Sequence, residues 1–502
     1  MILPLHRRGT RRASVGDERD HYRIDARRSL REWRWALRQR LGGRRELRNI
    51  ELEHRDTDVA DNEEVAIPED EQIEWQSFWL VELYAPSHAE ALKRGIKKLQ
   101  KGESSMFHFQ EPAAWLSEAR SWESGYWNVG HFSNRSDSSL ARAHRVGLPE
   151  VFSSMSAELK QLAPGITAMV LHFEIAEELT GCLEDVMEES FSTKAEPMRD
   201  RPGGQTIYGP QFRKEDRLAA VRDEIREPAR EWVGERVPGF FTELDIDIPA
   251  WDLVLSGGPG LFEESREPAE RWREALGYGN LFEQWASKEL PGLLIGRPHN
   301  ERSHPAPTVT GNKERAEELA RERHRQDGTS GINDLVDSAV SDLWVLWAFR
   351  EAIEAYGQTF TDVRDQLGVR RRRFGAGRRL KRLRDEVMSL SFDLQTAGEA
   401  ATNDLAMGQP HRRMGVEFLP LDFKRAKAKT VERPKTPLRQ SIQRHIAKRG
   451  VTVAEQGKAI TEGLRVQGEL LLASTNVRLQ WTLLLLTIVV GAATVVATLT
   501  AH

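Results

Sequence analysis

The chain has 502 residues, of which 39% are hydrophobic and 30% are charged, with a formal net charge of −4. That length accommodates roughly two or three domains and a sizeable core. The single cysteine, Cys182, excludes an intrachain disulfide and any zinc or iron–sulfur site built on several cysteines, and it suits a reducing compartment.

Charge is strongly segregated along the sequence. Residues 7–48 carry 15 arginines against 6 acids, and residues 51–74 carry 11 acids against a single arginine. Residues 364–384 and 424–449 each carry 10 basic residues and one acid. Such blocks are usually solvated faces and tails that neutralise one another. The alternative is contact with anionic lipid or with nucleic acid.

Residues 1–70 are predicted to form a charged, disordered arm. The first residues lack the apolar run of a signal peptide, so we expect the chain to remain in the cytoplasm. Within the arm, Tyr22–Leu41 has the pattern of a basic amphipathic helix. It could lie on a membrane surface, pack on the body or remain an arm. Its apolar face consists of Leu30, Trp33, Leu37 and Leu41.

Residues 71–295 alternate between strand and helix patterns, which predicts an α+β domain. A buried strand begins near Trp75, and Ser87 with Glu90 three residues later has the capping-box pattern that starts a helix. Residues 166–175 are the clearest strand. The predicted helices are residues 148–162, 176–189, 214–237, 266–275 and 281–288, and a further strand covers residues 251–256.

Residues 296–331 are polar and proline-containing, which is typical of a linker, with a helical piece over residues 313–325. Residues 332–478 change to a helical pattern that Pro410, Pro420, Pro434 and Pro437 interrupt. Two helices, residues 333–367 and 378–405, are expected to form an antiparallel hairpin. A last helix from Leu438 carries a heptad seam, which indicates self-association or packing on the hairpin. The seam consists of Ile446, Val453, Ile460, Leu464 and Leu471.

Residues 479–499 contain no charged side chain over 21 positions. A helix of that length spans the ~30 Å hydrocarbon layer of a bilayer. The sequence therefore predicts a C-terminal transmembrane helix and a tail-anchored, single-pass membrane protein whose body faces the cytoplasm. The positions that define the span are Leu479, Trp481, Leu485, Gly491 and Leu499.

Candidate metal or catalytic residues are few. His172 and Glu174 lie two residues apart in a predicted strand and so share a face, with His108 and His131 elsewhere in the same domain. Metal binding would need a third ligand, and a histidine on an apolar strand is more often a satisfied core residue. An acidic run could also bind a hard cation, but it lacks EF-hand spacing. It consists of Glu243, Asp245, Asp247 and Asp252.

Other motifs are incomplete. His299, Glu301 and His304 do not form the H-E-x-x-H pattern, and the glycine-rich residues 256–260 lack the lysine of a phosphate-binding loop. No catalytic residue, cofactor or metal ligand is predicted. A run of arginines between the hairpin helices could bind phosphate, although a solvated loop is the commoner interpretation. The run consists of Arg370, Arg371, Arg372 and Arg373.

The order of segments resembles that of CorA-type magnesium transporters over residues 332–499: a helical hairpin and a stalk that follow an α/β domain and enter the membrane. That family has a Gly-Met-Asn motif after its first span and then a second span. This sequence ends ATLTAH and has neither. The resemblance therefore implies an oligomeric stalk and transfers no ion-conducting residue.

The leading hypothesis is a non-enzymatic, membrane-tethered protein whose α+β domain binds a partner or ligand and whose stalk self-associates. One alternative is an oligomeric channel or transporter component, and another is a membrane-tethered enzyme of unknown class within residues 71–295. The expected partners are the lipid bilayer and either a second copy or another protein, with nucleic acid a lesser alternative.

Overall fold

The computed structural model describes a core with gaps, and all statements below concern that part of the chain. It covers residues 47–99, 116, 120, 125–133, 144–145, 147–197, 205–258, 271–278, 284–297, 306–326, 328–369, 393, 396, 416–421, 436–463, 465–466, 469 and 480.

A mixed ten-stranded sheet lies at the centre of the described residues, in the order β12-β9-β10-β11-β8-β1-β5-β4-β2-β3. Most neighbours are antiparallel, but β8 pairs with β11 and β2 with β3 in parallel. The strands are β1 (Ile73–Tyr84), β2 (Gly125–Ser133), β3 (His144–Arg145), β4 (Phe152–Ala163), β5 (Ile166–Ile175), β8 (Ala250–Ser256), β9 (Gln284–Ala286), β10 (Leu293–Gly296), β11 (Thr308–Asn312) and β12 (Leu419–Pro420). A separate hairpin pairs β6 (Lys194–Pro197) with β7 (Gln205–Tyr208).

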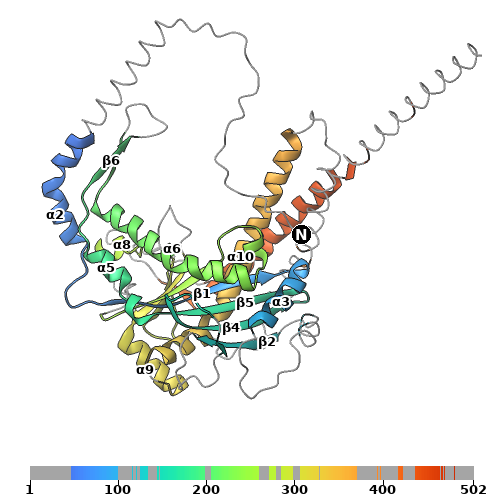
Figure 1. Ribbon diagram of the computed structural model, residues 1–502, viewed down its shortest axis with the longest axis horizontal. Coiled ribbons are helices and arrows are strands. Elements are labelled where there is room, and N and C mark those ends of the chain that lie inside the picture. The colour runs from blue at the N-terminus through green and yellow to red at the C-terminus, as the bar shows by residue number, and fades with distance from the viewer. Residues whose placement is uncertain are drawn as a thin grey trace, which may run out of the picture.

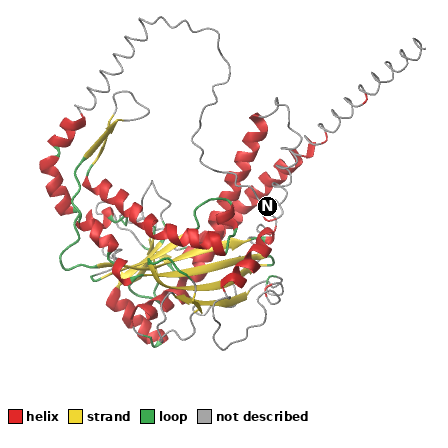
Figure 2. Ribbon diagram, viewed as in Figure 1, coloured by secondary structure: helices red, strands yellow, loops and turns green. Residues whose placement is uncertain are grey.

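Helices cover both faces of the sheet (Figures 1 and 2). One face carries α3 (Ala89–Leu99), α5 (Cys182–Glu188), α6 (Pro210–Arg236), α7 (Phe240–Glu243) and α8 (Arg271–Ala275). The other carries α9 (Lys313–His324) and α10 (Gly328–Val369). Two 3₁₀ turns, η1 (Pro86–His88) and η3 (Glu177–Leu179), follow β1 and β5.

Strand β1 is the centre of this three-layered arrangement. Eleven of its twelve residues are buried, because successive side chains point into opposite helical layers. Phe78 stacks on Phe173 of β5 on the α6 side, with ring centroids 5.5 Å apart. Trp79 lies 5.6 Å from Trp344 of α10 on the other side. The run of large apolar and aromatic residues in β1 is therefore explained by burial on both faces.

The strands expected near Trp75 and over residues 166–175 and 251–256 are confirmed, as are the helices that became α3 and α6. The helices predicted over residues 148–162 and 281–288 are wrong, since β4 occupies most of the first range and β9 lies within the second. The sequence of β4 also alternates between apolar and polar residues with period two. Residues Met155, Ala157 and Leu159 are buried, while the intervening polar residues face the other side of the sheet.

The acidic block that composition marked as disordered contains helix α2 (Arg55–Glu64), preceded by helical residues 47–53. Side chains of this helix bind backbone groups of the loop before β6. The amide of Thr193 donates to Asp58 (2.8 Å) and the amide of Phe191 donates to Asn62 (2.9 Å). Hydrogen bonds to a neighbouring loop thus hold this helix on the core, although the block has few apolar residues to bury.

Part of the predicted linker belongs to the sheet. Residues 308–312 form β11, parallel to β8, and α9 matches the helical piece expected there. Asn312 caps α9 by accepting a hydrogen bond from the amide of Arg315 (2.9 Å).

The prediction of a C-terminal transmembrane helix is corrected, and with it the tail-anchored, single-pass and membrane-located classification. Within the described ranges, none of the helices combines the length and the apolar character that crossing a bilayer requires. The 42-residue helix α10 is long enough, but charged residues such as Asp337, Asp342 and Arg350 recur along it. The positions named for the span lie outside the described residues: Leu479, Trp481, Leu485, Gly491 and Leu499.

Candidate functional site

Polar side chains gather on the face of the sheet that lies under and beside α10. Residues directly opposite each other in neighbouring strands point to the same face, so the register places them together. Ser156 lies opposite His172, and Ser154 lies opposite Glu174. We refer to the following set as the polar shelf: Tyr126 and His131 of β2; Ser154, Ser156, Glu158 and Lys160 of β4; and His172 and Glu174 of β5.

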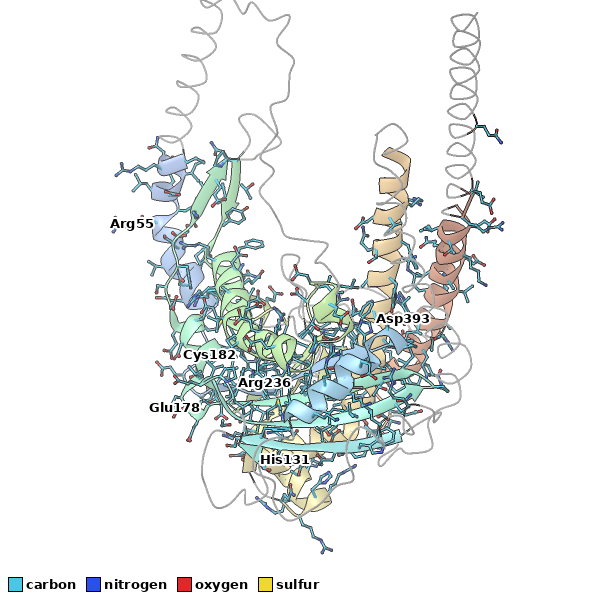
Figure 3. The ribbon with its side chains drawn as sticks, turned by 45° about the vertical axis from the view of Figure 1, so that its right-hand side comes forward. Arg55, His131, Glu178, Cys182, Arg236 and Asp393 are labelled. Carbon is cyan, nitrogen blue, oxygen red and sulfur yellow. The ribbon has the colours of Figure 1, made fainter. Side chains whose placement is uncertain are left out.

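The shelf runs from solvent to a closed inner end. His131 (labelled in Figure 3) and Tyr126, which is 41% exposed, lie at the β2 end. His172, 8% exposed, lies at the inner end under α10. The predicted pairing of His172 and Glu174 on one face is thus confirmed, and the strand β4 adds four polar residues to it.

The inner end is an aromatic and carboxyl cluster. The rings of Trp79 and His172 stack with centroids 4.4 Å apart and an interplanar angle of 8°. The indole Nε1 of Trp79 donates to Asp337 Oδ1 of α10 (3.1 Å). This bond attaches α10 to the centre of the sheet.

A second set of bonds connects Glu174 to α10. The side-chain Nδ2 of Asn333 donates to one carboxylate oxygen of Glu174 (3.0 Å), and the Ser154 hydroxyl donates to the other (2.6 Å). The Ser77 hydroxyl of β1 in turn donates to Asn333 Oδ1 (2.9 Å). Both oxygens of Glu174 are therefore satisfied, which is what a half-buried carboxylate requires.

Asp342 connects the shelf to a third element. Its Oδ1 lies 3.4 Å from Nζ of Lys160, which also donates to the Ser341 hydroxyl. Its Oδ2 accepts from Nη2 of Arg439 (3.2 Å), at the start of the helix formed by residues 438–463. One carboxylate thus joins β4, α10 and the last described helix.

The environment shifts two pKa values in opposite directions. Burial lowers the pKa of His172 to about 4, so the imidazole is neutral near pH 7. Burial, followed by the nearby charge of Glu158, raises the pKa of Asp337 to about 7. The shelf therefore has one carboxyl group beside it that changes charge near neutral pH.

Two buried polar atoms of the shelf have no hydrogen-bond partner among the described residues: His172 Nε2 and Glu158 Oε2. The other oxygen of Glu158 accepts from the Tyr126 hydroxyl. A buried polar atom without a partner costs about 1–3 kcal/mol, and such atoms in native proteins often mark sites with a binding role.

The four α10 residues of this site were missed by sequence reasoning, which treated α10 only as a source of apolar positions. The sequence nevertheless contains a pattern that marks a polar face on α10. Asn333, Asp337 and Ser341 recur at intervals of four, which places them on one face of a helix. Their position against a polar strand face could not be read from the sequence.

The other candidate metal ligands do not lie close to one another. Within the described parts of the chain, no group of three or more His, Cys, Asp or Glu residues could hold a metal ion. Glu243 lies 3.5 Å from His88, Asp247 is near Arg230, and Asp252 pairs with Arg226 in the core. The remaining candidates His108, His299, Glu301 and His304 fall outside the described residues.

The glycine-rich turn after β8 is occupied by protein groups. The amide of Gly258 donates to Glu71 (2.8 Å), and the carbonyls of Gly257 and Gly258 accept from the Asn312 side chain. The Gly258 amide is therefore unavailable to a phosphate, and so is the Gly257 amide, which donates to the carbonyl of Gln72 (2.8 Å). The arginine run, Arg370, Arg371, Arg372 and Arg373, lies outside the described residues, so anion binding there stays a prediction.

A serine, a histidine and the carboxyl groups of Asp393 and Glu243 also meet at the end of β1. The Ser87 hydroxyl donates to Asp393 (labelled in Figure 3) and lies 3.1 Å from Nδ1 of His88. The Ser87 amide also donates to Asp393 (3.2 Å). Burial lowers the pKa of His88 to about 4, which makes it a poor general base. The arrangement therefore fits a cap on η1 better than a nucleophilic site.

The heptad seam packs inside the chain where it is described. Ile446 and Val453 are fully buried and Ile460 is 8% exposed. Helix 438–463 lies along α10, where Glu354 binds His445 (3.0 Å) and Arg449 (2.9 Å). Of the two alternatives that the sequence left open, this is packing on the first predicted hairpin helix. The second, residues 378–405, lies outside the described residues except for positions 393 and 396. Leu464 and Leu471 lie outside the described residues.

No protein-family model matches this chain, and no curated protein matches its sequence. The resemblance to CorA-type transporters stays a prediction.

Proposed function

We propose that the protein binds a small organic cation on the polar shelf and that binding sets the position of a helical arm that contacts a partner protein. The helical arm is the end of α10 that extends past the sheet, together with residues 438–463. Figure 3 shows these two helices rising side by side from the core. The observation that carries the proposal is the bridge at Asp342, which bonds to Lys160 of the shelf and to Arg439 of the arm.

A cationic ligand follows from the charges at the shelf. Glu158 and Glu174 belong to the shelf, and Asp337 and Asp342 of α10 lie beside it, which makes four carboxyl groups. The basic groups are Lys160 and, at Asp342, Arg439, because the buried His172 is neutral. The charge of Glu158 adds to the larger effect of burial in raising the pKa of Asp337, so negative charge is crowded between these two carboxyl groups. An ammonium or guanidinium group beside Glu158 would relieve that crowding and give its partnerless oxygen a donor. The ring of Tyr126 offers a cation a second favourable contact.

The shelf is coupled to the arm because Lys160 and Arg439 share the carboxylate of Asp342. Nζ of Lys160 lies 5.9 Å from the ring centre of Tyr126 and also binds Asp342. A ligand cation at Tyr126 and Glu158 would repel Lys160 toward Asp342, where Arg439 competes for the same carboxylate. Occupancy of the shelf therefore changes how strongly the arm is held.

The arm presents a polar outer face to a partner. The described seam positions are used against α10, whereas Arg444, Lys448, Glu455 and Lys458 are exposed. A mixed-charge helical face of this kind favours electrostatic complementarity with another protein.

Isothermal titration calorimetry of the full chain with putrescine, agmatine and choline, and with uncharged glycerol, tests ligand binding. We expect at least one amine to bind, glycerol not to bind, and Glu158→Gln to weaken amine binding at least tenfold. The matched control is Glu178→Gln, an exposed glutamate of η3 (labelled in Figure 3). Absence of amine binding at millimolar concentration, or equal affinity in E158Q and wild type, would refute the ligand assignment.

Amide hydrogen exchange over residues 438–463, with and without the amine that binds, tests the coupling. We expect exchange there to change on binding in the wild type and not in Asp342→Asn. An unchanged exchange pattern in the wild type would separate ligand binding from arm position and contradict the second half of the proposal.

A further inference from the structure

A second surface lies on helix 47–64 and the elements that hold it, away from the polar shelf. One side of this helix is bound to the core. The amide of Ala195 donates to Glu51 (3.2 Å), that of Thr193 to Asp58 (2.8 Å), and the side chain of Asn62 donates to the carbonyl of Phe191 (2.7 Å). Glu51, Asp58 and Asn62 recur at intervals of seven and four, so they form one face of the helix.

The neighbouring side exposes large apolar residues. Leu52 is 58% exposed and Val59 is 61% exposed, seven residues apart. Ile207 of β7 is 46% exposed and Phe212 of α6 is 57% exposed. Half of the large apolar side chains that are exposed in the described part of the chain thus belong to this set. We call these four residues the apolar patch.

Contacts between the elements that carry these four residues bring the elements together. Ile207 pairs across the hairpin with Ala195, whose amide binds Glu51, next to Leu52. Phe212 adjoins Arg213, whose guanidinium lies 5.3 Å from the ring centre of Phe191. Figure 1 shows α2 and the β6–β7 hairpin side by side near the start of α6.

The rim of the apolar patch is acidic. Residues 47–64 include seven acids and two arginines, and Glu53, Asp56 and Glu63 are exposed. An apolar strip bordered by carboxylates is complementary to an amphipathic helix whose polar border is basic.

The sequence predicts such a helix immediately upstream, in residues that lie outside the described part. Tyr22–Leu41 has Leu30, Trp33 and Leu37 on one predicted face, and the flanking positions are rich in arginine. Gly42 and Gly43 precede the described helix and suit a tight turn between two antiparallel helices. At about 1.5 Å per residue, both segments would be roughly 27–30 Å long, so they match in length.

We infer that Tyr22–Leu41 folds back at Gly42–Gly43 and packs its apolar stripe on the apolar patch, with its arginines against the acidic rim. The interaction neutralises the arginine-rich block of residues 7–48 with the acidic block of residues 51–74 and removes the patch from water. It is independent of any ligand on the polar shelf.

Photo-cross-linking of the full chain tests this inference. p-Benzoylphenylalanine replaces Trp33, the sample is irradiated, and the adducts are mapped by mass spectrometry. We expect adducts within one chain at or beside Leu52, Val59, Ile207 or Phe212. The double variant Leu52→Asp/Val59→Asp should lower their yield at least fivefold, and 1 M salt should also lower it.

The matched control is Val451→Asp, since Val451 is also an exposed valine (51%) but lies on the helical arm. It should leave the yield unchanged. Adducts between two chains would show that a second copy occupies the patch, and adducts elsewhere or none would show that this segment does not. Each of these three results overturns the inference.

Discussion

The rings of Trp79 and His172 lie parallel, with centroids 4.4 Å apart, where β1 and β5 pass under α10. The two residues are direct neighbours across the sheet, and Trp344 of α10 covers Trp79 from above at 5.6 Å. A charged imidazole in this position would be cut off from water, which explains why the pKa of His172 falls to about 4. The stack therefore closes the inner end of the polar shelf to water, and the His172 imidazole within it is neutral.

Replacing His172 by phenylalanine should keep the stack and remove a titratable group. The folded-state pKa of His172 is about 4, below its ordinary value of 6.5. Its contribution to the free energy of unfolding is therefore present above pH 6.5 and is lost as pH falls toward 4. We expect the full chain carrying His172→Phe to lose less stability on acidification than the wild type, by on the order of 3 kcal/mol.

Urea unfolding at pH 7.5 and pH 4.5 measures this difference. Trp79→Ala is the comparison that removes the stack instead, at a cost of about 3–5 kcal/mol at either pH. If wild type and His172→Phe lost the same stability between the two pH values, the neutral buried imidazole would be ruled out.

Replacing Asp337 by asparagine should have the opposite pH dependence. Its folded-state pKa is raised from 3.8 to about 7, so its contribution to stability is complete below pH 3.8 and is lost as pH rises through 7. Asparagine keeps an acceptor for Trp79 Nε1 and cannot ionise. We expect Asp337→Asn to be as stable as wild type at pH 4 and more stable at pH 8, by thermal unfolding. Asp334→Asn, an exposed position three residues earlier, should show little change. A stability gain of equal size at both pH values would contradict the raised pKa.

The sequence was sufficient for elements whose pattern is local. Strands β1 and β5 follow from continuous buried runs, and α10 follows from apolar spacing of three and four. Strand β4 was mistaken for a helix because a short sequence with several polar residues fits both periods. Strand β11 was placed in a linker because its partner, β8, is more than 50 residues away, and no local pattern reveals that pairing.

The same limit applies to the site. His172 and Glu174 could be paired from their spacing on a strand. The bond of Glu174 to Asn333, 159 positions away, depends on the packing of α10 on the sheet. So does the bond of Asp337 to Trp79, which stacks on His172. The partnerless atoms and the shifted pKa values exist only after that packing forms.

Gly357 permits the close approach of the two arm helices. A Cβ atom at this position would lie 3.0 Å from Nη2 of Arg449 and 3.2 Å from Cγ2 of Val453. Gly357→Leu should force the helices apart, break the Glu354–Arg449 pair and destabilise the arm by about 1–3 kcal/mol. Hydrogen exchange over residues 438–463 should rise at least tenfold. Gly463→Leu is the control, because nothing lies within 4 Å of an added Cβ there. Equal exchange in the two variants would show that the helices do not pack at Gly357.

The pair Arg226–Asp252 should show the cost of an uncompensated buried charge. Asp252, one of the acids considered for cation binding, is 1% exposed and bonds to Arg226, which is 5% exposed and lies 5.4 Å from the ring centre of Trp75. Asp252→Asn strands the guanidinium and should lower the free energy of unfolding by about 3–5 kcal/mol. Removing both charges, as Arg226→Met/Asp252→Leu, leaves no buried ion, so the loss should be clearly smaller. Urea unfolding of both variants measures it. A double variant as unstable as the single one would show that packing around the pair, and not its charge, determines the cost.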